Sequence, residues 1–539
     1  MPGPSETSGA STWSPLRIGT FRALWLAALA SNIGNWMQEI GGAWLMTSLT
    51  PSPLMVALIG TAMSLPLFVF GLPAGAIGDV VDRRRFLIGT LMLKTLAAAG
   101  LGVVTVLGLT TPWVLLGFSL ALGFGVALYT PVWQAVTPEV VPREELPSAI
   151  ALNGVALNVA RAIGPALGGI LLAVVDPGFV FLLNAASYVT IAVVVYRWRR
   201  PVVESPLPAE RILGAMRSGV RYVRHTPEFR AVCVRIGIFI LFGSAIWALL
   251  PILGRQEFGF GALQYGLLVG ALGVGAVTTA TFLPKLRKKL STDAMVNLAT
   301  VLFAGAALVL ANVRIIPLAF VVMFLAGSGW IVIMSSFNTA AQQTSAMWVR
   351  ARTLAVYSIV FQGGTAIGSA VWGAIASRLG IATALSAAAI GMLASVAAAF
   401  RYRISGGAER DLTPSTHWPQ PILVTEARPT DGPVLISVEY RIAAENAEAF
   451  LTAIHELERV RRRDGAFEWG VYRDTKDATR FIEEFLVESW AEHLRQHERF
   501  THADRELEER VRGWHAGDSP VLVSHHIYAR RPSKRVAPE

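Results

Sequence analysis

The sequence predicts an all-α polytopic membrane protein with 12 transmembrane helices in two six-helix halves, followed by a C-terminal α+β domain. Three observations lead to this prediction. First, 53% of the 539 residues are hydrophobic and only 16% are charged, a balance too apolar for a soluble chain of this length. Second, twelve apolar runs are about 20 residues long, enough to cross a bilayer. Third, the composition becomes charged after Phe400.

The apolar runs are separated by turn-forming residues and short basic loops. Residues 17–200 form the first half and residues 229–404 the second, whereas residues 1–16 are expected to be a disordered cytoplasmic tail because they lack a signal-peptide pattern. The runs begin near Phe21, Pro53, Phe86, Pro112, Pro147, Gly178, Phe229, Gly261, Thr292, Ile315, Thr353 and Ile381.

Charge predicts the orientation. Residues 1–400 carry 26 Lys and Arg against 13 Asp and Glu, and the basic residues gather in alternate loops such as "DRRR" (82–85) and "KLRKK" (285–289). Basic loops stay on the cytoplasmic side, so both termini are expected there, in a bacterial-type inner membrane. This distribution favours contact with the lipid bilayer and gives no indication of nucleic-acid binding.

The two halves are related by an internal repeat. "FRALW" (21–25) opens the first run and "FRAVC" (229–233) opens the seventh, while "ARAIGPALGGIL" (160–171) has an echo in "GTAIGSAVWGAI" (364–375). Both pairs are separated by roughly 205 residues, which indicates a duplicated six-helix unit with a binding site between the halves. Residues 201–228 connect the halves and contain an amphipathic helix expected on the inner leaflet.

The C-terminal region predicts a separate small domain. After a linker (405–432), residues 433–530 alternate as strand, helix, strand, strand, helix and strand, which is the ferredoxin-like order; residues 531–539 form a tail. We expect one helix over residues 490–514. His493, His497 and His502 are interpreted as surface residues, because they lack a clear third ligand, so no metal and no cofactor is predicted. The single cysteine, Cys233, excludes a disulfide framework.

Residues 17–404 resemble the major facilitator superfamily (MFS), and in particular its enterobactin-exporter-like branch, the transmembrane secretion effectors. The resemblance lies in "GNWMQEIGGAWL" (34–45), "GAIGDVVDRRR" (75–85) and "ARAIGPALGGIL" (160–171). It implies the MFS fold and a small-molecule substrate. Residues 433–530 resemble the antibiotic-biosynthesis-monooxygenase-like dimeric α/β-barrel domains, which implies a homodimeric contact between two such domains.

Two motifs follow from the first resemblance. The "GAIGDVVDRRR" element implies a cytoplasmic gate formed by Gly75, Asp79, Arg83 and Arg84, in which Asp79 caps a neighbouring helix and the arginines anchor the loop. The fifth run carries Gly164, Pro165, Gly168 and Gly169, where small residues allow close helix packing and the proline can bend the helix. A merely basic turn and generic packing remain the alternatives.

Polar residues inside the spans are candidates for contact with substrate or a coupling ion, because burying them is costly. Asn32, Asn35 and Glu39 share one helical face of the first run, and Gln362 lies in the eleventh. Arg161 is interpreted as the only obvious deep cation of the first half. We hypothesise that Arg161 balances Glu39 or an anionic substrate; structural roles for both are equally open.

The sequence therefore predicts a secondary transporter that exports a small amphipathic or aromatic compound, such as a drug, siderophore or secondary metabolite, by alternating access. The chain has no GxxxxGK[ST] motif, so the energy is expected from a gradient, with proton coupling left open. Two alternatives remain: an importer of the same fold, and a membrane-tethered sensor or enzyme acting through the C-terminal domain. No catalytic residue is assigned.

Overall fold

The computed structural model describes residues 13–80, 82–134, 136–198, 212–404, 410–418, 427–517 and 519–529, with only the backbone of residues 72, 74–80, 143 and 212–216. The chain divides into two compact units. The first comprises residues 1–212, 232–339 and 355–405, and the second comprises residues 213–231, 340–354 and 406–539. Two short segments, residues 213–231 between the predicted halves and residues 340–354 within the second half, belong to the same unit as the C-terminal region. The domain boundaries drawn from the sequence therefore remain predictions.

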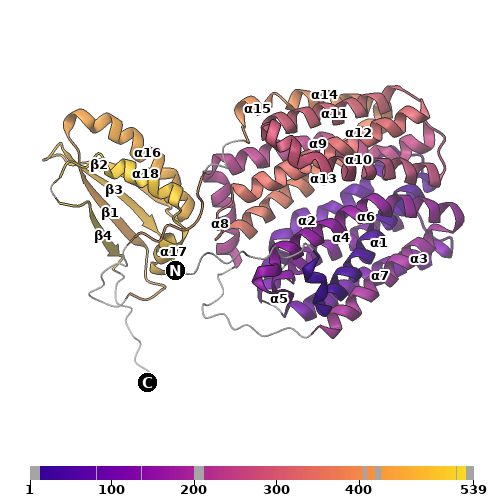
Figure 1. The fold of residues 1–539 in the computed structure, drawn as a ribbon, viewed down its shortest axis with the longest axis horizontal. Coiled ribbons are helices and arrows are strands. Elements are labelled where there is room, and N and C mark those ends of the chain that lie inside the picture. Colours follow the sequence, from indigo (N-terminus) through magenta and orange to yellow (C-terminus); the bar gives the residue numbers. More distant parts are fainter. Residues whose placement is uncertain are drawn as a thin grey trace, which may run out of the picture. The chain divides into compact units, whose positions relative to one another are not determined.

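Within the described part of the chain, twelve long helices coincide with the twelve predicted runs (Figure 1). Four of them begin at a proline, which fits the first helical position because its missing N–H would be unpaired there anyway. The helices are α1 (Gly19–Leu49), α2 (Pro53–Val80), α3 (Arg83–Val106), α4 (Pro112–Gln134), α6 (Leu146–Val174), α7 (Pro177–Arg197), α9 (Pro227–Gln256), α10 (Ala262–Lys289), α11 (Thr292–Asn312), α12 (Ile316–Gln343), α13 (Arg350–Leu379) and α14 (Ile381–Ser395).

Eleven of these helices, among the described residues, are long and apolar enough to cross a membrane. The prediction of a multi-pass membrane protein is thereby confirmed. Helix α1 is not one of the eleven, although it is 31 residues long. Its asparagines, glutamine and glutamate between residues 32 and 39 lower its hydropathy below that of its neighbours. Short helices α5 (Thr137–Val140) and α15 (Ala398–Arg401) complete the helical elements of this region.

Two helix pairs join the two halves inside the first unit. Helix α6 packs against α10, where a Cβ added at Gly169 would lie 2.7 Å from the Cα of Gly266. Helix α2 packs against α13, where the hydroxyl of Thr61 donates to the carbonyl of Ala366 at 2.8 Å and a Cβ at Gly373 would lie 2.5 Å from the Cβ of Ala57. Small residues therefore set the distance between the halves.

The second unit contains helix α8 (Ile212–His225), which confirms the predicted helix of the central connection, and a small antiparallel sheet. The sheet order is β2-β3-β1-β4, with β1 antiparallel to both β3 and β4. The elements are β1 (Val434–Arg441), α16 (Ala447–Asp464), β2 (Glu468–Arg473), β3 (Arg480–Val487), α17 (Trp490–Arg499), α18 (His502–Arg512) and β4 (Leu522–Ile527). We call residues 433–530 the tail domain.

The prediction of one helix over residues 490–514 is wrong, because α17 ends at Arg499 and α18 begins at His502. Thr501 interrupts the helix with a capping box: its hydroxyl accepts from the backbone N–H of Asp504, and its own N–H donates to the Asp504 carboxylate. Phe500 adopts an extended conformation and is buried. The hydrogen bonds of this cap thus favour the start of a new helix over the continuation of α17.

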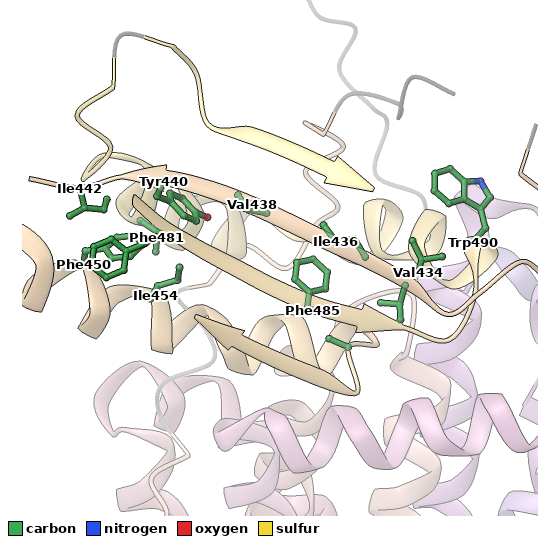
Figure 2. Close-up of a cluster of buried hydrophobic side chains, with 13 residues drawn as sticks. Val434, Ile436, Val438, Tyr440, Ile442, Phe450, Ile454, Phe481, Phe485 and Trp490 are labelled. Atoms are coloured by element: carbon green, nitrogen blue, oxygen red, sulfur yellow. The ribbon is translucent and has the colours of Figure 1, made fainter. Parts of the chain in front are cut away.

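One face of the sheet carries the core of the tail domain (Figure 2). Alternate residues of β1, from Val434 to Tyr440, are buried, and their neighbours along the strand are partly exposed. Alternation with period two is expected of a strand with one covered face. Phe450 and Ile454 of α16 pack into the same cluster, so the core lies between this face and the helices.

Candidate functional site

Helix α6 holds the predicted fifth-span motif between two other helices. A Cβ at Gly164 would lie 2.6 Å from the Cβ of Trp36 on α1, and one at Gly168 would lie 3.1 Å from the Cα of Met37. Gly169 points to the other side, toward α10. Pro165 is buried inside the helix. The motif therefore sets two close helix contacts at once, while its part in gating stays a prediction.

A row of aromatic rings joins the two halves. Trp36 of α1 lies 6.2 Å from Trp247 of α9, measured between ring centroids, and Trp247 lies 5.5 Å from Trp330 of α12. Trp330 lies in turn 6.4 Å from Phe361 of α13. Nε1 of Trp247 is buried and has no acceptor among the described residues. The row offers apolar surface together with one unused hydrogen-bond donor, a combination typical of ligand sites.

The guanidinium of Arg161 on α6 lies 5.8 Å from the ring of Trp36. This distance is within the range of a cation–π contact. The charges of Arg161 and Glu39 are close enough to influence each other, but no ion pair or hydrogen bond joins the two among the described contacts. The hypothesis that Arg161 balances Glu39 therefore stays a prediction. The side chain of Glu39 is accessible to solvent although protein atoms surround it densely. The cation is therefore placed at the end of the aromatic row.

Asn35 belongs to a second polar group, formed between α1 and α7. The hydroxyl of Tyr188 donates to Oδ1 of Asn35, and Nδ2 of Asn184 donates to Oε1 of Gln38. Nδ2 of Asn184 also contacts the hydroxyl of Tyr188 at 3.0 Å. Asn184 is fully buried. These groups therefore bind one another inside the helix bundle, although Nε2 of Gln38 is buried without a partner among the described residues.

Asn32 and Gln362 form no described hydrogen bond with the residues of the aromatic row or with the polar network of Asn35. Asn32 is partly exposed on α1, and Gln362 is partly exposed on α13, next to Phe361 of the aromatic row. The structure thus brings Arg161 and Glu39 together, and it places Asn35 in a separate network with α7.

Lys94 of α3 is a buried cation that the sequence reasoning missed. Its side chain is 2% exposed, and its Nζ lies 4.1 Å from the ring of Tyr188 and 4.9 Å from the ring of Tyr129. No carboxylate pairs with it among the described ion pairs. The interpretation of Arg161 as the only deep cation of the first half is therefore wrong. A single lysine in the apolar run 86–106 was the available signal.

The second half also holds a buried cation, but with acidic and amide partners. Arg235 of α9, which is 6% exposed, forms an ion pair with Asp293 of α11 and donates to Oδ1 of Asn297 at 2.6 Å. The backbone N–H of Ile404 donates to Oδ2 of Asp293 at 3.2 Å. The charge is thus balanced within the fold.

The predicted gate motif lies at the end of α2 and the start of α3. Gly75 and Asp79 fall within α2, but their side-chain surroundings lie outside the described residues. Arg83 forms an ion pair with Glu139 of α5 at 2.7 Å, and Nε of Arg84 donates to the carbonyl of Val195 at the end of α7 at 3.3 Å. The start of α3 is therefore held to two other elements, and its gating role stays a prediction.

The tail domain holds three neighbouring histidines. The interpretation of His493 as a surface residue is wrong, because its side chain is 2% exposed. Its Nε2 lies 3.3 Å from Nε2 of His497, and its ring lies 4.7 Å from that of His525. Burial, together with the neighbouring histidines, lowers the pKa of His493 to about 3 and that of His497 to about 4. His502 begins α18 and is not part of this cluster.

The described residues contain no group of three or more His, Cys, Asp or Glu side chains placed to hold a metal ion. The histidine cluster therefore consists of neutral rings packed against one another and against Trp490. At neutral pH these rings are uncharged, because their pKa values are depressed.

Two related bundles of apolar helices, joined by small-residue seams and an aromatic row, define the class of multi-pass membrane transporters. The chain matches the family model "Transmembrane secretion effector" over residues 10–533. The protein belongs to this family of MFS transporters.

Relatives with assigned names are similar over much of the chain. The staphyloferrin A transporter of Staphylococcus aureus (strain NCTC 8325 / PS 47) is 25% identical over 277 residues, which cover 51% of this chain and 70% of that protein. The enterobactin exporter EntS of Escherichia coli O1:K1 / APEC is 26% identical over 379 residues, which cover 69% of this chain and 89% of that protein.

Solved structures support the fold. A bacterial homologue of the human lysosomal transporter Spinster, in an inward-facing and unoccupied conformation, aligns with a TM-score of 0.54 at 14% identity, covering 73% of this chain and 96% of that one. A POT family transporter in complex with 5-aminolevulinic acid aligns with a TM-score of 0.57 at 12% identity, covering 72% and 96%. At these identities the likeness concerns the fold alone.

Proposed function

We propose that the protein is a secondary exporter of a small, anionic, aromatic or amphipathic compound of the siderophore type. The observation that carries this proposal is the row of Trp36, Trp247 and Trp330, which ends at the Arg161 guanidinium and draws on both halves. Aromatic rings bind the flat apolar part of such a ligand, and a guanidinium binds its carboxylate or phenolate. The names of two relatives, which refer to staphyloferrin A and enterobactin, support this class of compound.

Alternating access is the proposed mechanism. Rocking of the halves about the α6–α10 and α2–α13 seams would expose the aromatic row first to one side and then to the other. Helix α1 is proposed as the twelfth span, with its polar residues facing the substrate path and both termini in the cytoplasm. Glu39, which is accessible to solvent and close to Arg161, is the proposed coupling carboxylate for protons.

Transport into inside-out membrane vesicles tests direction and site together. With enterobactin and staphyloferrin A as probes, an exporter takes up compound in inside-out vesicles and not in right-side-out vesicles. We expect Trp247→Ala to lower the uptake rate at least tenfold. Trp113→Ala is the matched control, since Trp113 is 68% exposed at the start of α4.

Uptake only in right-side-out vesicles would favour the importer. Equal loss in both tryptophan variants would argue against the aromatic row as the binding site. A protonophore that leaves the uptake rate unchanged would contradict proton coupling.

The tail domain is proposed to be ferredoxin-like and to pair with a second copy through its open sheet face. The strand order β2-β3-β1-β4, antiparallel throughout, supports that fold. Leu435 of β1 pairs with Leu486 of β3 on the open face, where Leu522 and Tyr472 are 57% and 58% exposed. Such a face aggregates or pairs when left bare.

Light scattering of the purified full chain in detergent tests the pairing. We expect a dimer for the unchanged protein and a monomer for Leu435→Glu, with Arg441→Ala, on the same strand, as control. A monomer in all three would contradict the proposal.

A further inference from the structure

Inside the second unit, Arg221 joins helix α8 to the tail domain. Nε of Arg221 donates to the carbonyl of Arg463, at the end of α16, at 3.0 Å, and its Nη2 donates to Glu492 of α17 at 3.2 Å. The same guanidinium therefore donates hydrogen bonds to the backbone of α16 and to a carboxylate of α17. Arg410, ahead of the tail domain, adds an ion pair with Glu228 at the start of α9, at 2.9 Å.

The next residue of α8 binds the connection between α12 and α13, which we call the α12–α13 loop (residues 344–349). Tyr222 is 1% exposed. Its hydroxyl donates to the carbonyl of Thr344 at 2.9 Å and accepts from the N–H of Ala346 at 3.1 Å. The guanidinium of Arg463 lies 5.7 Å from its ring. Tyr222 therefore contacts the loop with its hydroxyl and the tail domain with its ring.

The loop also contacts the tail domain directly. The guanidinium of Arg499 on α17 lies 4.6 Å from the ring of Trp348. Arg499 is held in place by Glu492 at 2.6 Å. In the same way, Arg463 is fixed by Asp464 and Asp504, at 2.8 Å and 2.6 Å. Carboxylates of the tail domain therefore orient both arginines. Arg463 then contacts the ring of Tyr222 on α8, and Arg499 contacts the ring of Trp348 in the loop.

This arrangement has a mechanical consequence through chain continuity. The loop joins two predicted spans, α12 and α13, and α8 leads directly into a third, α9. In alternating access the cytoplasmic ends of such helices change their spacing. A tail domain bound to both α8 and the loop opposes a change in the distance between them.

We propose that the tail domain is an intramolecular brake: by binding α8 and the α12–α13 loop, it slows the opening of the cytoplasmic end of the second half. The proposal rests on the transport function proposed above. Its test therefore uses measurements that need no substrate.

The test compares full-length variants in lipid nanodiscs. Arg221→Ala with Trp348→Ala removes the two hydrogen bonds of Arg221 to the tail domain and the ring under Arg499. Arg441→Ala is the matched control, because it breaks a single exposed ion pair, with Asp477, elsewhere on the tail domain. Hydrogen exchange is measured over residues 344–349, 217–225 and 490–499. Opening is measured as the rate at which a maleimide labels Cys233, the single cysteine of the chain, which is 7% exposed near the start of α9.

We expect at least fivefold faster exchange in all three segments of the double variant, and at least twofold faster labelling of the cysteine. The control should match the unchanged protein in both. Faster exchange in α8 and the loop but not in 490–499 would overturn the contact. Faster hydrogen exchange in all three segments, together with unchanged or slower labelling of the cysteine, would contradict the proposal that the tail domain slows opening. Because neither readout involves a substrate, failure of the proposed export would appear separately, as absent uptake in vesicles.

Discussion

The two halves of the membrane bundle treat a buried cation in opposite ways. In the second half, Arg235 is balanced by Asp293 and bonded to Asn297. In the first half, Lys94 lies among the rings of Tyr129 and Tyr188, with no carboxylate partner among the described ion pairs. A balanced charge stabilises the fold in which it is buried, whereas an unbalanced charge costs stability. The difference teaches that Lys94 is the better candidate for a functional cation and Arg235 for a structural one.

The tail domain follows the pattern of the second half. Arg461 is 3% exposed and binds Glu483 at 3.0 Å and Glu508 at 3.3 Å. Burial by itself would raise the pKa of Glu508, but Arg461 and Arg512, together with the hydrogen bonds from Trp418 and His417, hold that pKa below its usual range. Balanced charge is therefore the rule in the described interior, and Lys94 departs from it.

Removal of Arg235 should produce the largest effect. Arg235→Met leaves Asp293 without its counter-ion, and loss of one partner of a buried pair costs about 3 kcal/mol of the free energy of unfolding. Thermal unfolding in detergent measures the loss. The double variant Arg235→Met with Asp293→Asn should recover most of it, because the lone charge is gone. A full loss of stability in the double variant would contradict the structural role.

Removal of Lys94 should separate activity from stability. We expect Lys94→Met to lower the transport rate in vesicles at least tenfold while the midpoint of thermal unfolding stays the same or rises, because an unbalanced buried charge is removed. Lys285→Met, at the exposed end of α10, is the control. Loss of stability in Lys94→Met with normal transport would reverse the comparison between the halves.

The histidine cluster of the tail domain extends the comparison to buried titratable groups that are uncharged at neutral pH. His493 has a pKa of about 3 when folded and 6.5 as its ordinary value, so between these values the unfolded chain binds more protons. Stability is then complete above about pH 6.5 and falls as the pH drops below it, by about 1 kcal/mol at pH 5.5 for this residue. Hydrogen exchange of β1 and β3, corrected for intrinsic rates, measures this dependence.

His493→Gln should weaken that dependence, since an amide does not titrate, while His497 keeps contributing with the same sign. His455→Gln is the control, because His455 lies on the exposed side of α16. An unchanged pH dependence in His493→Gln would locate the titrating group elsewhere.

The smallest effect concerns Glu39 and Arg161, which interact without a direct hydrogen bond among the described contacts. A double-mutant cycle of Glu39→Gln and Arg161→Ala should give a coupling energy of about 0.5–1 kcal/mol in transport rate. Purely additive effects would leave Lys94 as the main functional cation of the first half.

Much of the fold could be predicted from the sequence, because it depends on local signals. Apolar runs of sufficient length, with Pro53 and Pro112 at two of their starts, located the helices to within a few residues. The small residues of the fifth run likewise predicted close packing, and a Cβ at Gly164 or Gly169 would indeed meet α1 or α10.

The candidate site could be predicted only in part, because its decisive features depend on tertiary contacts. Nothing local to Lys94 indicates that two tyrosines from α4 and α7 surround it. The burial of His493 depends on His525, which is 32 residues away on β4. The break at Thr501 was visible as a T-x-x-D capping box but lay within an otherwise helical pattern.

The contact of Gly169 with Gly266 has a further consequence for the cost of movement. At this contact the two backbones meet with no side chain between them, so no rotamer has to change there when one helix slides along the other. Interdigitated side chains would resist such a shift until they had repacked together. Helices α6 and α10 can therefore slide past each other at this contact at low energetic cost. A single methyl group added there would obstruct that movement.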